Sequence, residues 1–245
     1  MQIFECVHAV AGVDVELLEA GPAPALRNLI GTSFHLGVQR FMSAAHVLRE
    51  VERYPLRAIT YFVGPEIRFA PVSEIEYAEH LDIGVFRAEV PNAATPRWSF
   101  RGEALLEGIV AGGFPYALDT ENKSITVRTF RGYIVAAYRY IQMTGQPGVY
   151  ETSFQSPRGL SGAPLWIGGF GVPLELVGIV VANRSTEMLA FSERERTREG
   201  LETVVERFEA LQLGIAIQSA AIADIPFQTL GSTVRAYVDQ QQPSP

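Results

Sequence analysis

Three side chains of types that cooperate in hydrolysis stand in separate, mostly apolar stretches of the sequence. His46 follows a run of small residues, Asp82 precedes an apolar run, and Ser161 lies within Gly-Leu-Ser-Gly. A serine hydroxyl becomes nucleophilic when an imidazole takes its proton, and a carboxylate fixes the tautomer of that imidazole. Histidine suits the role of base because its ordinary pKa lies near neutral pH. These residue types predict a nucleophilic serine site.

The order of the three residues along the chain distinguishes between hydrolase families. The order here is His, Asp, Ser, whereas α/β-hydrolases run Ser, Asp, His and subtilisins run Asp, His, Ser. Through this order and its flanking residues, the chain resembles the trypsin-like serine peptidases of the chymotrypsin fold. Further segments resemble bacterial trypsin-like and Deg-type peptidase domains: Ile30–Phe34, Ala111–Pro115, Leu176–Val181 and Leu213–Ser219.

The resemblance implies a role for each residue of the site. His46 would be the general base, Asp82 its orienting carboxylate and Ser161 the nucleophile, with the backbone amides of Gly159 and Ser161 as oxyanion donors. The residues implied at the substrate pocket are Gln155, Ser156, Arg158, Val181, Ala182 and Asn183. No acidic residue stands at the implied base of this pocket. We therefore expect a small or medium uncharged residue before the scissile bond (P1), with acidic residues favoured near Arg158.

Two departures from the family pattern affect regulation and redox chemistry. Secreted members carry an aspartate before the serine that pairs with a new N-terminus after zymogen cleavage, and here that residue is Leu160. This activation switch is therefore expected to be absent, and we expect control by a partner that orders the loop from Gly159 to Ser161. Cys6 is the only cysteine, which excludes an intrachain disulfide.

Composition limits the class of partner. The net charge of −7 and the absence of a basic run argue against nucleic acid, and no run approaches the roughly 20 apolar residues of a membrane span. Four histidines and one cysteine show no zinc pattern, so no metal or cofactor is expected. The first residues lack the features of a signal peptide. These features predict a cytoplasmic protein, and the resemblance implies a bacterial one that acts on a protein or peptide substrate.

Many short apolar runs separated by glycine and proline turns predict an all-β fold. The resemblance specifies two six-stranded barrels with the active site between them. The stretch Val90–Pro96 has the composition of a linker. We therefore expect one barrel over residues 1–95, carrying His46 and Asp82, and a second over residues 96–245, carrying Ser161.

One segment departs from the β pattern. Ser192 and Glu195 form a capping-box pattern, and a set of apolar residues then repeats at helical spacing: Leu201, Val204, Val205, Phe208 and Leu211. This predicts a helical insertion over residues 192–211, which is either a solvated surface helix or a docking site for a regulatory protein. A second, C-terminal helix is expected over residues 231–241.

Two functions from different classes fit these features. The first is a serine endopeptidase, acting as a bacterial intracellular effector or processing protease under the control of a partner. The alternative is a catalytically silent binding or scaffold module on the same fold, with its site closed by Leu160 and the insertion. The fold alone does not choose between them, because unrelated functions share folds. The complete His-Asp-Ser set favours the enzyme.

Overall fold

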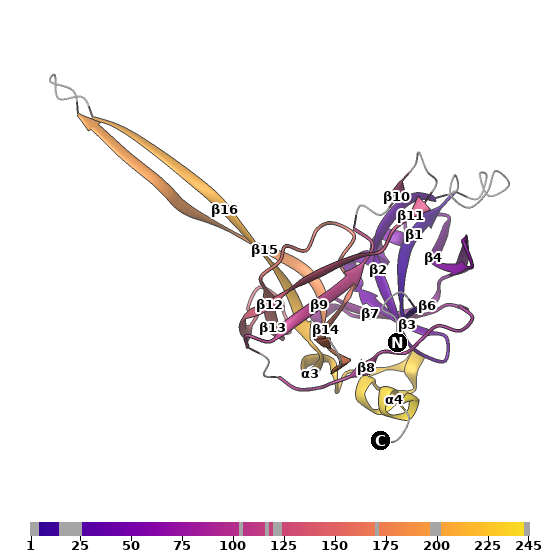
Figure 1. Cartoon of the computed structure of the whole chain (residues 1–245). Helices are drawn as coiled ribbons and strands as arrows, with labels where there is room; N and C mark the ends of the chain where they lie inside the picture. The colour runs from indigo at the N-terminus through magenta and orange to yellow at the C-terminus, as the bar shows by residue number, and fades with distance from the viewer. Residues whose placement is uncertain are drawn as a thin grey trace.

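The computed structural model describes residues 5–14, 26–102, 105–115, 118–119, 124–169, 172–196 and 202–242. Its body consists of two curled β-sheets that lie side by side, and a long two-stranded ribbon projects from the second of them (Figure 1). Apolar side chains fill the interior of both sheets, and the largest fully buried ones include Trp166, Tyr150, Phe34 and Phe41. No helix among the described residues is long and apolar enough to span a membrane.

The first sheet closes into a barrel through a bent strand. Its strands, in chain order, are β1(Val7–Val13), β2(Leu26–Gly37), β3(Arg40–Ala44), β4(Leu56–Val63), β5(Glu66–Pro71), β6(Ser73–Ala78) and β7(Ile83–Arg87). They pair in the order β5-β4-β1-β2-β3-β7-β6. Only Val72 separates β5 from β6, so the two form one bent strand that joins both ends of the sheet. Six strands therefore surround this core.

The second sheet also closes on itself. Its strands are β8(Arg97–Trp98), β9(Gly108–Gly113), β12(Arg128–Arg139), β13(Gly148–Thr152), β14(Pro164–Gly169), β15(Val172–Arg196) and β16(Glu202–Gln218). They pair in the order β14-β9-β12-β13-β16-β15-β8, and a further pairing of β14 with β15 closes a ring of six. A small ribbon, β10(Leu118–Asp119) and β11(Ser124–Ile125), lies apart. The expected pair of six-stranded barrels is confirmed, while the division at residues 95 and 96 stays a prediction.

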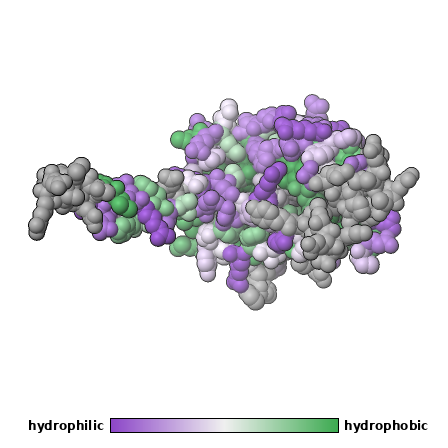
Figure 2. All heavy atoms as spheres, turned by 90° about the horizontal axis from the view of Figure 1, so that it is seen from above, coloured by the Kyte–Doolittle hydropathy of each residue, from purple (hydrophilic) through white to green (hydrophobic). Residues whose placement is uncertain are grey.

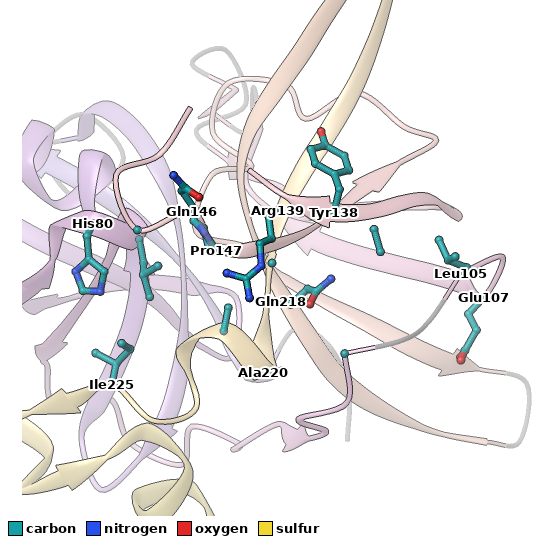
Figure 3. A pocket seen from close by; sticks show the side chains of 16 residues that line it. His80, Leu105, Glu107, Tyr138, Arg139, Gln146, Pro147, Gln218, Ala220 and Ile225 are labelled. Carbon is teal, nitrogen blue, oxygen red and sulfur yellow. The ribbon is translucent and has the colours of Figure 1, made fainter. Parts of the chain in front are cut away.

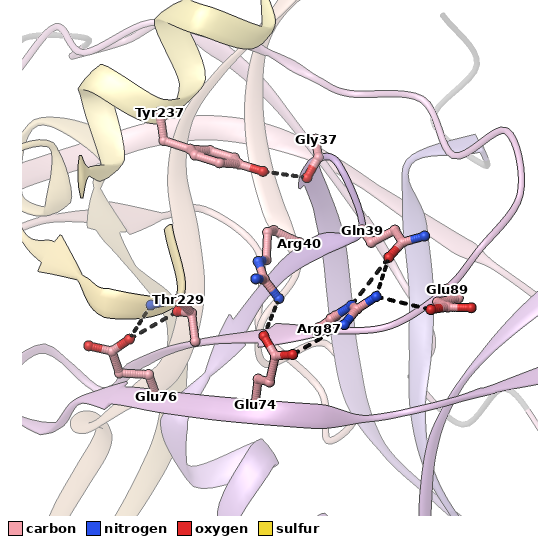
Figure 4. A network of polar contacts seen from close by, with 9 residues as sticks. All are labelled: Gly37, Gln39, Arg40, Glu74, Glu76, Arg87, Glu89, Thr229 and Tyr237. Atoms are coloured by element: carbon pink, nitrogen blue, oxygen red, sulfur yellow. Dashed lines mark hydrogen bonds and ion pairs between the residues drawn. The ribbon is translucent and has the colours of Figure 1, made fainter. Parts of the chain in front are cut away.

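The C-terminal segment leaves the second barrel and packs back against the first. It consists of α3(Ser219–Ile222), β17(Pro226–Phe227), η4(Gln228–Leu230), β18(Ser232–Thr233) and α4(Val234–Gln241). The carboxylate of Glu76 accepts hydrogen bonds from the backbone amide and the hydroxyl of Thr229, both at 2.9 Å. The hydroxyl of Tyr237 donates to the carbonyl of Gly37 at 2.7 Å (Figure 4). Helix α4 confirms the expected C-terminal helix, and these bonds fasten it to the first barrel.

The predicted helix over residues 192–211 is wrong. Residues 192–196 continue strand β15 and residues 202–211 belong to β16, while 197–201 lie outside the described residues. The two strands form the projecting ribbon, paired from Arg184 with Leu213 to Arg196 with Glu202. We call this ribbon, residues 184–196 and 202–213, the hairpin arm.

The composition of this segment explains the difference. Valine and phenylalanine, which prefer strands, supply most of the apolar residues that were assigned to one helical face. In a helix the like-charged pair Arg194 and Arg198 would also repel at four-residue spacing. In the ribbon, Leu189 lies opposite Phe208 and Arg194 opposite Val204. Apolar cross-strand pairs such as Leu189 with Phe208 stabilise a sheet. The ribbon therefore gives these apolar residues partners, whereas a helix would bring like charges together.

Candidate active site

Asp82 fixes both the position and the orientation of His46. The histidine lies in the first turn of α2(Ala45–Val51), directly after strand β3, where Ala44 offers no capping side chain. Asp82 supplies the missing cap from another segment: its Oδ1 accepts from the amide of His46 at 2.9 Å and its carbonyl from the amide of Ala45 at 2.9 Å. The remaining oxygen, Oδ2, lies 2.7 Å from Nδ1 of the His46 ring.

The backbone of Asp82 makes this arrangement possible. The short helix η3(Glu79–Leu81) ends at Asp82, which adopts the left-handed conformation with φ of 53°. Aspartate tolerates this conformation better than most residues because its short side chain bonds locally. The amide of Gly145, in the second barrel, donates to the carbonyl of His80 at 3.0 Å and holds this turn from the other side.

Ser161 lies on a tight turn that is held by both barrels. Gly162, with φ of +85°, follows it, and the amide of Gly162 donates to the carbonyl of Val180 at 2.7 Å. The carbonyl of Ser161 accepts from the amide of Thr32 in the first barrel at 2.9 Å. The hydroxyl of Ser161 lies 3.5 Å from the carbonyl of Val181. The turn therefore presents the hydroxyl between β15 and the first barrel.

The structure brings His46 and Ser161 to the same cavity. This hollow has a volume of about 430 Å³ and is lined by residues of both barrels: Ile30, His46, Arg49, Glu50, Arg53, Arg158, Gly159 and Ser161. The side chain of His46 is 49% exposed and that of Asp82 is 22% exposed. Water can thus reach the imidazole, while the carboxylate behind it is more shielded.

Comparisons with solved structures identify this arrangement of strands. The active form of the Rv3671c protease from M. tuberculosis matches with a TM-score of 0.57 and 13% identity, over 90% of this chain and 79% of that one. The MamO protease domain from Magnetospirillum magneticum matches with a TM-score of 0.54 and 11% identity, over 89% and 93%. The serine endoprotease from Yersinia pestis matches with a TM-score of 0.55 and 17% identity, over 98% and 65%. This chain has the trypsin-like serine protease fold.

Comparisons based on sequence add nothing to this assignment. No family model matches the chain, and no curated protein matches it. At the identities given above, the structural likeness establishes the trypsin-like fold, and the chemistry has to be inferred from the site itself.

Two backbone amides near Ser161 are free to donate hydrogen bonds to an oxyanion. Within the described part of the chain, the amides of Gly159 and Ser161 make no backbone hydrogen bond, and both residues line the cavity with His46. Gly159 has φ of +98°, and a Cβ there would collide with the backbone of Phe114. Only glycine fits this turn without strain. The expected oxyanion residues therefore line the same cavity as His46, and their amides make no backbone hydrogen bond within the described residues.

Thr32 supports this loop, and sequence reasoning gave it no such role. Its hydroxyl donates to the carbonyl of Gly159 at 2.8 Å and accepts from the amide of Phe114 at 3.0 Å. Leu160 is fully buried in the core of the second barrel, and its amide donates to the carbonyl of Pro157 at 2.9 Å. The loop that an aspartate would anchor in secreted relatives is thus held here by packing and by Thr32. The only signal in the sequence was the Gly-Thr-Ser stretch before His46.

Two of the expected substrate-pocket residues, Asn183 and Ser156, are hydrogen-bonded to each other. The side-chain oxygen of Asn183 accepts from the amide of Ser156 at 2.6 Å, and its side-chain nitrogen donates to the carbonyl of Ser156. Asn183 therefore links β15 to the segment before the nucleophile. Ser156 is buried, whereas Gln155, which carries no charge, is exposed. Val181 and Ala182 precede Asn183 in β15, and the carbonyl of Val181 is the one that lies 3.5 Å from the hydroxyl of Ser161.

Arg158 lines the cavity of His46 and Ser161 together with two other arginines, Arg49 and Arg53. Arg49 pairs with Glu79, and Arg53 pairs with Glu50 at 2.7 Å. Arg158 is exposed and has no ion-pair partner among the described residues. The positive charge of Arg158 is therefore not neutralised by a neighbouring carboxylate in the described part of the chain, unlike the charges of the other two arginines in the cavity.

A larger cavity of about 1140 Å³ lies elsewhere in the molecule, between the first barrel, strand β12 and the C-terminal segment (Figure 3). His80 and Arg139 line it, but His46 and Ser161 do not. Across the described ranges, no group of three or more histidine, cysteine, aspartate or glutamate side chains is placed to hold a metal ion.

Proposed function

We propose that this protein is a serine endopeptidase in which Ser161 is the nucleophile, His46 the general base and Asp82 the residue that orients His46. The observation that carries the proposal is the hydrogen-bonded pair of His46 and Asp82 at 2.7 Å, with Ser161 in the same cavity beside two unbonded backbone amides. Nucleophile, base, orienting carboxylate and oxyanion donors are the parts that acyl transfer requires.

The reaction follows from these positions. With the proton of Nδ1 directed at Asp82, the free Nε2 of His46 takes the proton of Ser161 as the hydroxyl attacks the scissile carbonyl. The amides of Gly159 and Ser161 stabilise the oxyanion. His46 then gives its proton to the leaving amine, which departs and leaves an acyl ester on Ser161. A water molecule, deprotonated by His46, hydrolyses the ester, releases the acid and restores the serine.

The proposal includes a small or medium uncharged residue at P1. Asn183 bonds both backbone groups of Ser156, so its amide occupies space between the two segments that the resemblance assigns to the P1 pocket. The test is digestion of a peptide library, with cleavage sites read by mass spectrometry. We expect cleavage after alanine and other small residues, and no digestion by the Ser161→Ala variant. Preferred cleavage after lysine or arginine would contradict the P1 assignment.

The acidic preference near Arg158 can be read in the same digests. An acidic side chain on the leaving-group side would pair with Arg158, an exposed interaction worth about 0.2–1 kcal/mol, or up to about fivefold in kcat/KM. We expect acidic residues to be enriched just after the cleaved bond by the wild type and by Arg158→Lys. Arg158→Ala should remove the enrichment. An unchanged enrichment in Arg158→Ala would assign the preference to another residue.

The catalytically silent module remains the alternative, but the structure does not support the two features once expected to close its site. Leu160 is buried in the core of the second barrel, and the segment expected to be a helix projects away from the body as the hairpin arm (Figure 1). A chain that cleaves no peptide would nevertheless favour the binding module.

An intracellular processing role and control by a partner belong to the same proposal. Because Thr32 and the packing of Leu160 already hold the nucleophile loop, a partner that merely orders this loop has little left to do. A partner would instead have to act on access to the cavity. Full cleavage by the purified chain alone would argue against control by a partner.

A further inference from the structure

The free backbone edge of β15 runs outward from the nucleophile. Strand β14 pairs with β15 only as far as Ile179, and the nucleophile turn bonds Val180. Beyond that point, within the described residues, β15 pairs with β16 alone as far as Arg196. An unpaired strand edge of this kind offers a row of N–H and C=O groups to another extended chain.

The orientation of these groups can be read from neighbouring bonds. The amide of Gly214, which lies opposite Asn183, donates to the carbonyl of Phe154 and hence points away from β15. Asn183 therefore directs its own backbone groups to the free edge, as Val181 directs its carbonyl to Ser161. Because backbone groups alternate along a strand, those of residues 185 and 187 face the same edge.

This edge has a defined end. The pairing of β15 with β16 shifts register twice, between Val180 and Ala182 at the start of this edge and between Leu189 and Phe191 at its far end, and each shift marks a β-bulge. Bulges bend a strand and interrupt pairing along its edge. From Val181 to Leu189 the edge therefore spans nine residues, about 27 Å at ~3.4 Å per residue.

Apolar side chains accompany the end of this edge. Leu189 and Phe208 lie opposite each other and are 52% and 53% exposed. In Figure 2, apolar and polar side chains alternate along the described part of the hairpin arm, which stands clear of the body. A strand added to the edge would place one of its own side chains beside Leu189, where an apolar residue would be partly buried.

The resemblance to trypsin-like peptidases implies that Val181, Ala182 and Asn183 pair with the backbone of the substrate. We propose that residues 184–189 of the hairpin arm continue this pairing and bind the substrate as an extended strand, to nine residues before the scissile bond. This inference rests on the proposed function. In the antiparallel register set by P1 at Val181, P3 lies at Asn183, P5 at Ser185, P7 at residue 187 and P9 at Leu189. The ligand is an unfolded, extended polypeptide segment with an apolar residue at P9.

The test uses peptidyl diphenyl phosphonates with alanine at P1, extended to P3, P9 or P12. We expect the wild-type second-order rate of inactivation to rise about tenfold or more from P3 to P9 and then to level off. N-methylation at P5 and P7 should remove the gain, because those amides face β15. N-methylation at P4 and P6 should leave it in place. Equal rates for the P3 and P9 probes would overturn the inference.

Two shortened variants locate the effect. Replacing residues 185–212 with Asn-Gly joins the paired residues Arg184 and Leu213 by a two-residue turn and removes the proposed edge. Replacing residues 192–206 with Asn-Gly, between the paired Phe191 and Arg207, keeps the edge up to the bulge. The first variant should react with all probes at the P3 rate, and the second should behave as wild type.

Other outcomes would identify other occupants. Loss of the length dependence in both variants would overturn the proposal in favour of a role for the distal end of the hairpin arm, such as contact with a second copy of the chain. Reaction of the first variant with the P3 probe at the wild-type rate shows that its site has folded. A wild-type chain that reacts with neither probe would contradict the proposed function, and this inference with it.

Discussion

Replacing Asp82 with asparagine is expected to lower kcat about 10⁴-fold, the loss known for this change in trypsin-like enzymes. The reason lies in the two oxygens of Asp82. An asparagine oxygen can still accept from the amide of His46, which leaves the amide nitrogen facing Nδ1. Nδ1 must then accept, so the proton of the neutral ring moves to Nε2, which can no longer take a proton from Ser161. Peptide hydrolysis by the two proteins measures the effect.

The free energy of unfolding distinguishes this effect from simple misfolding. Asp82→Asn keeps a group that can cap α2, so we expect a similar unfolding midpoint in urea for variant and wild type. Asp82→Ala removes the cap as well and should lose about 0.5–2 kcal/mol in addition to activity. An Asp82→Asn variant that is fully folded and fully active would exclude this carboxylate from the mechanism.

Replacing Gly162 with alanine is expected to destabilise the fold by about 3 kcal/mol or more and to abolish peptide hydrolysis. Its φ of +85° costs an L-residue about 1–2 kcal/mol. An added Cβ would also lie well inside van der Waals contact of the Thr32 carbonyl and the Ser43 hydroxyl, an overpacking worth about 1–3 kcal/mol. The nucleophile turn would have to move to relieve the contact. Chemical unfolding and peptide cleavage report the two effects.

Gly231 provides the matched control for this substitution. It has a φ of +68°, and a Cβ there would meet nothing within 4 Å. Gly231→Ala should therefore show only the conformational cost of about 1–2 kcal/mol and keep its activity. Equal losses of stability in the two variants would show that the contact with Thr32 is relieved without cost.

The parts of this site that local sequence specifies could be predicted, and the parts made by distant segments could not. His46, Asp82 and Ser161 stand in short stretches whose small residues and glycines form the turns that the chemistry needs. The support given by Thr32 depends on three segments meeting, so the Gly-Thr-Ser stretch alone does not predict it.

The hairpin arm shows a different limit. Residues spaced by three and four, such as Val204 and Phe208, can share one face of a helix, but in a two-stranded ribbon each is paired across to β15. Local spacing was therefore compatible with both structures. The pairing of Leu189 with Phe208, which decides between them, is visible only when both strands are in place.

The activation of Ser161 by His46 can be tested by locating the adduct that a fluorophosphonate leaves on the chain. The purified wild type, His46→Ala and Ser161→Ala proteins would be treated in parallel, digested and mapped by mass spectrometry. We expect a single phosphonylated residue, Ser161, in the wild type, and no adduct in either variant. An adduct on Ser161 that forms equally fast in His46→Ala, or no adduct in the wild type, would contradict it.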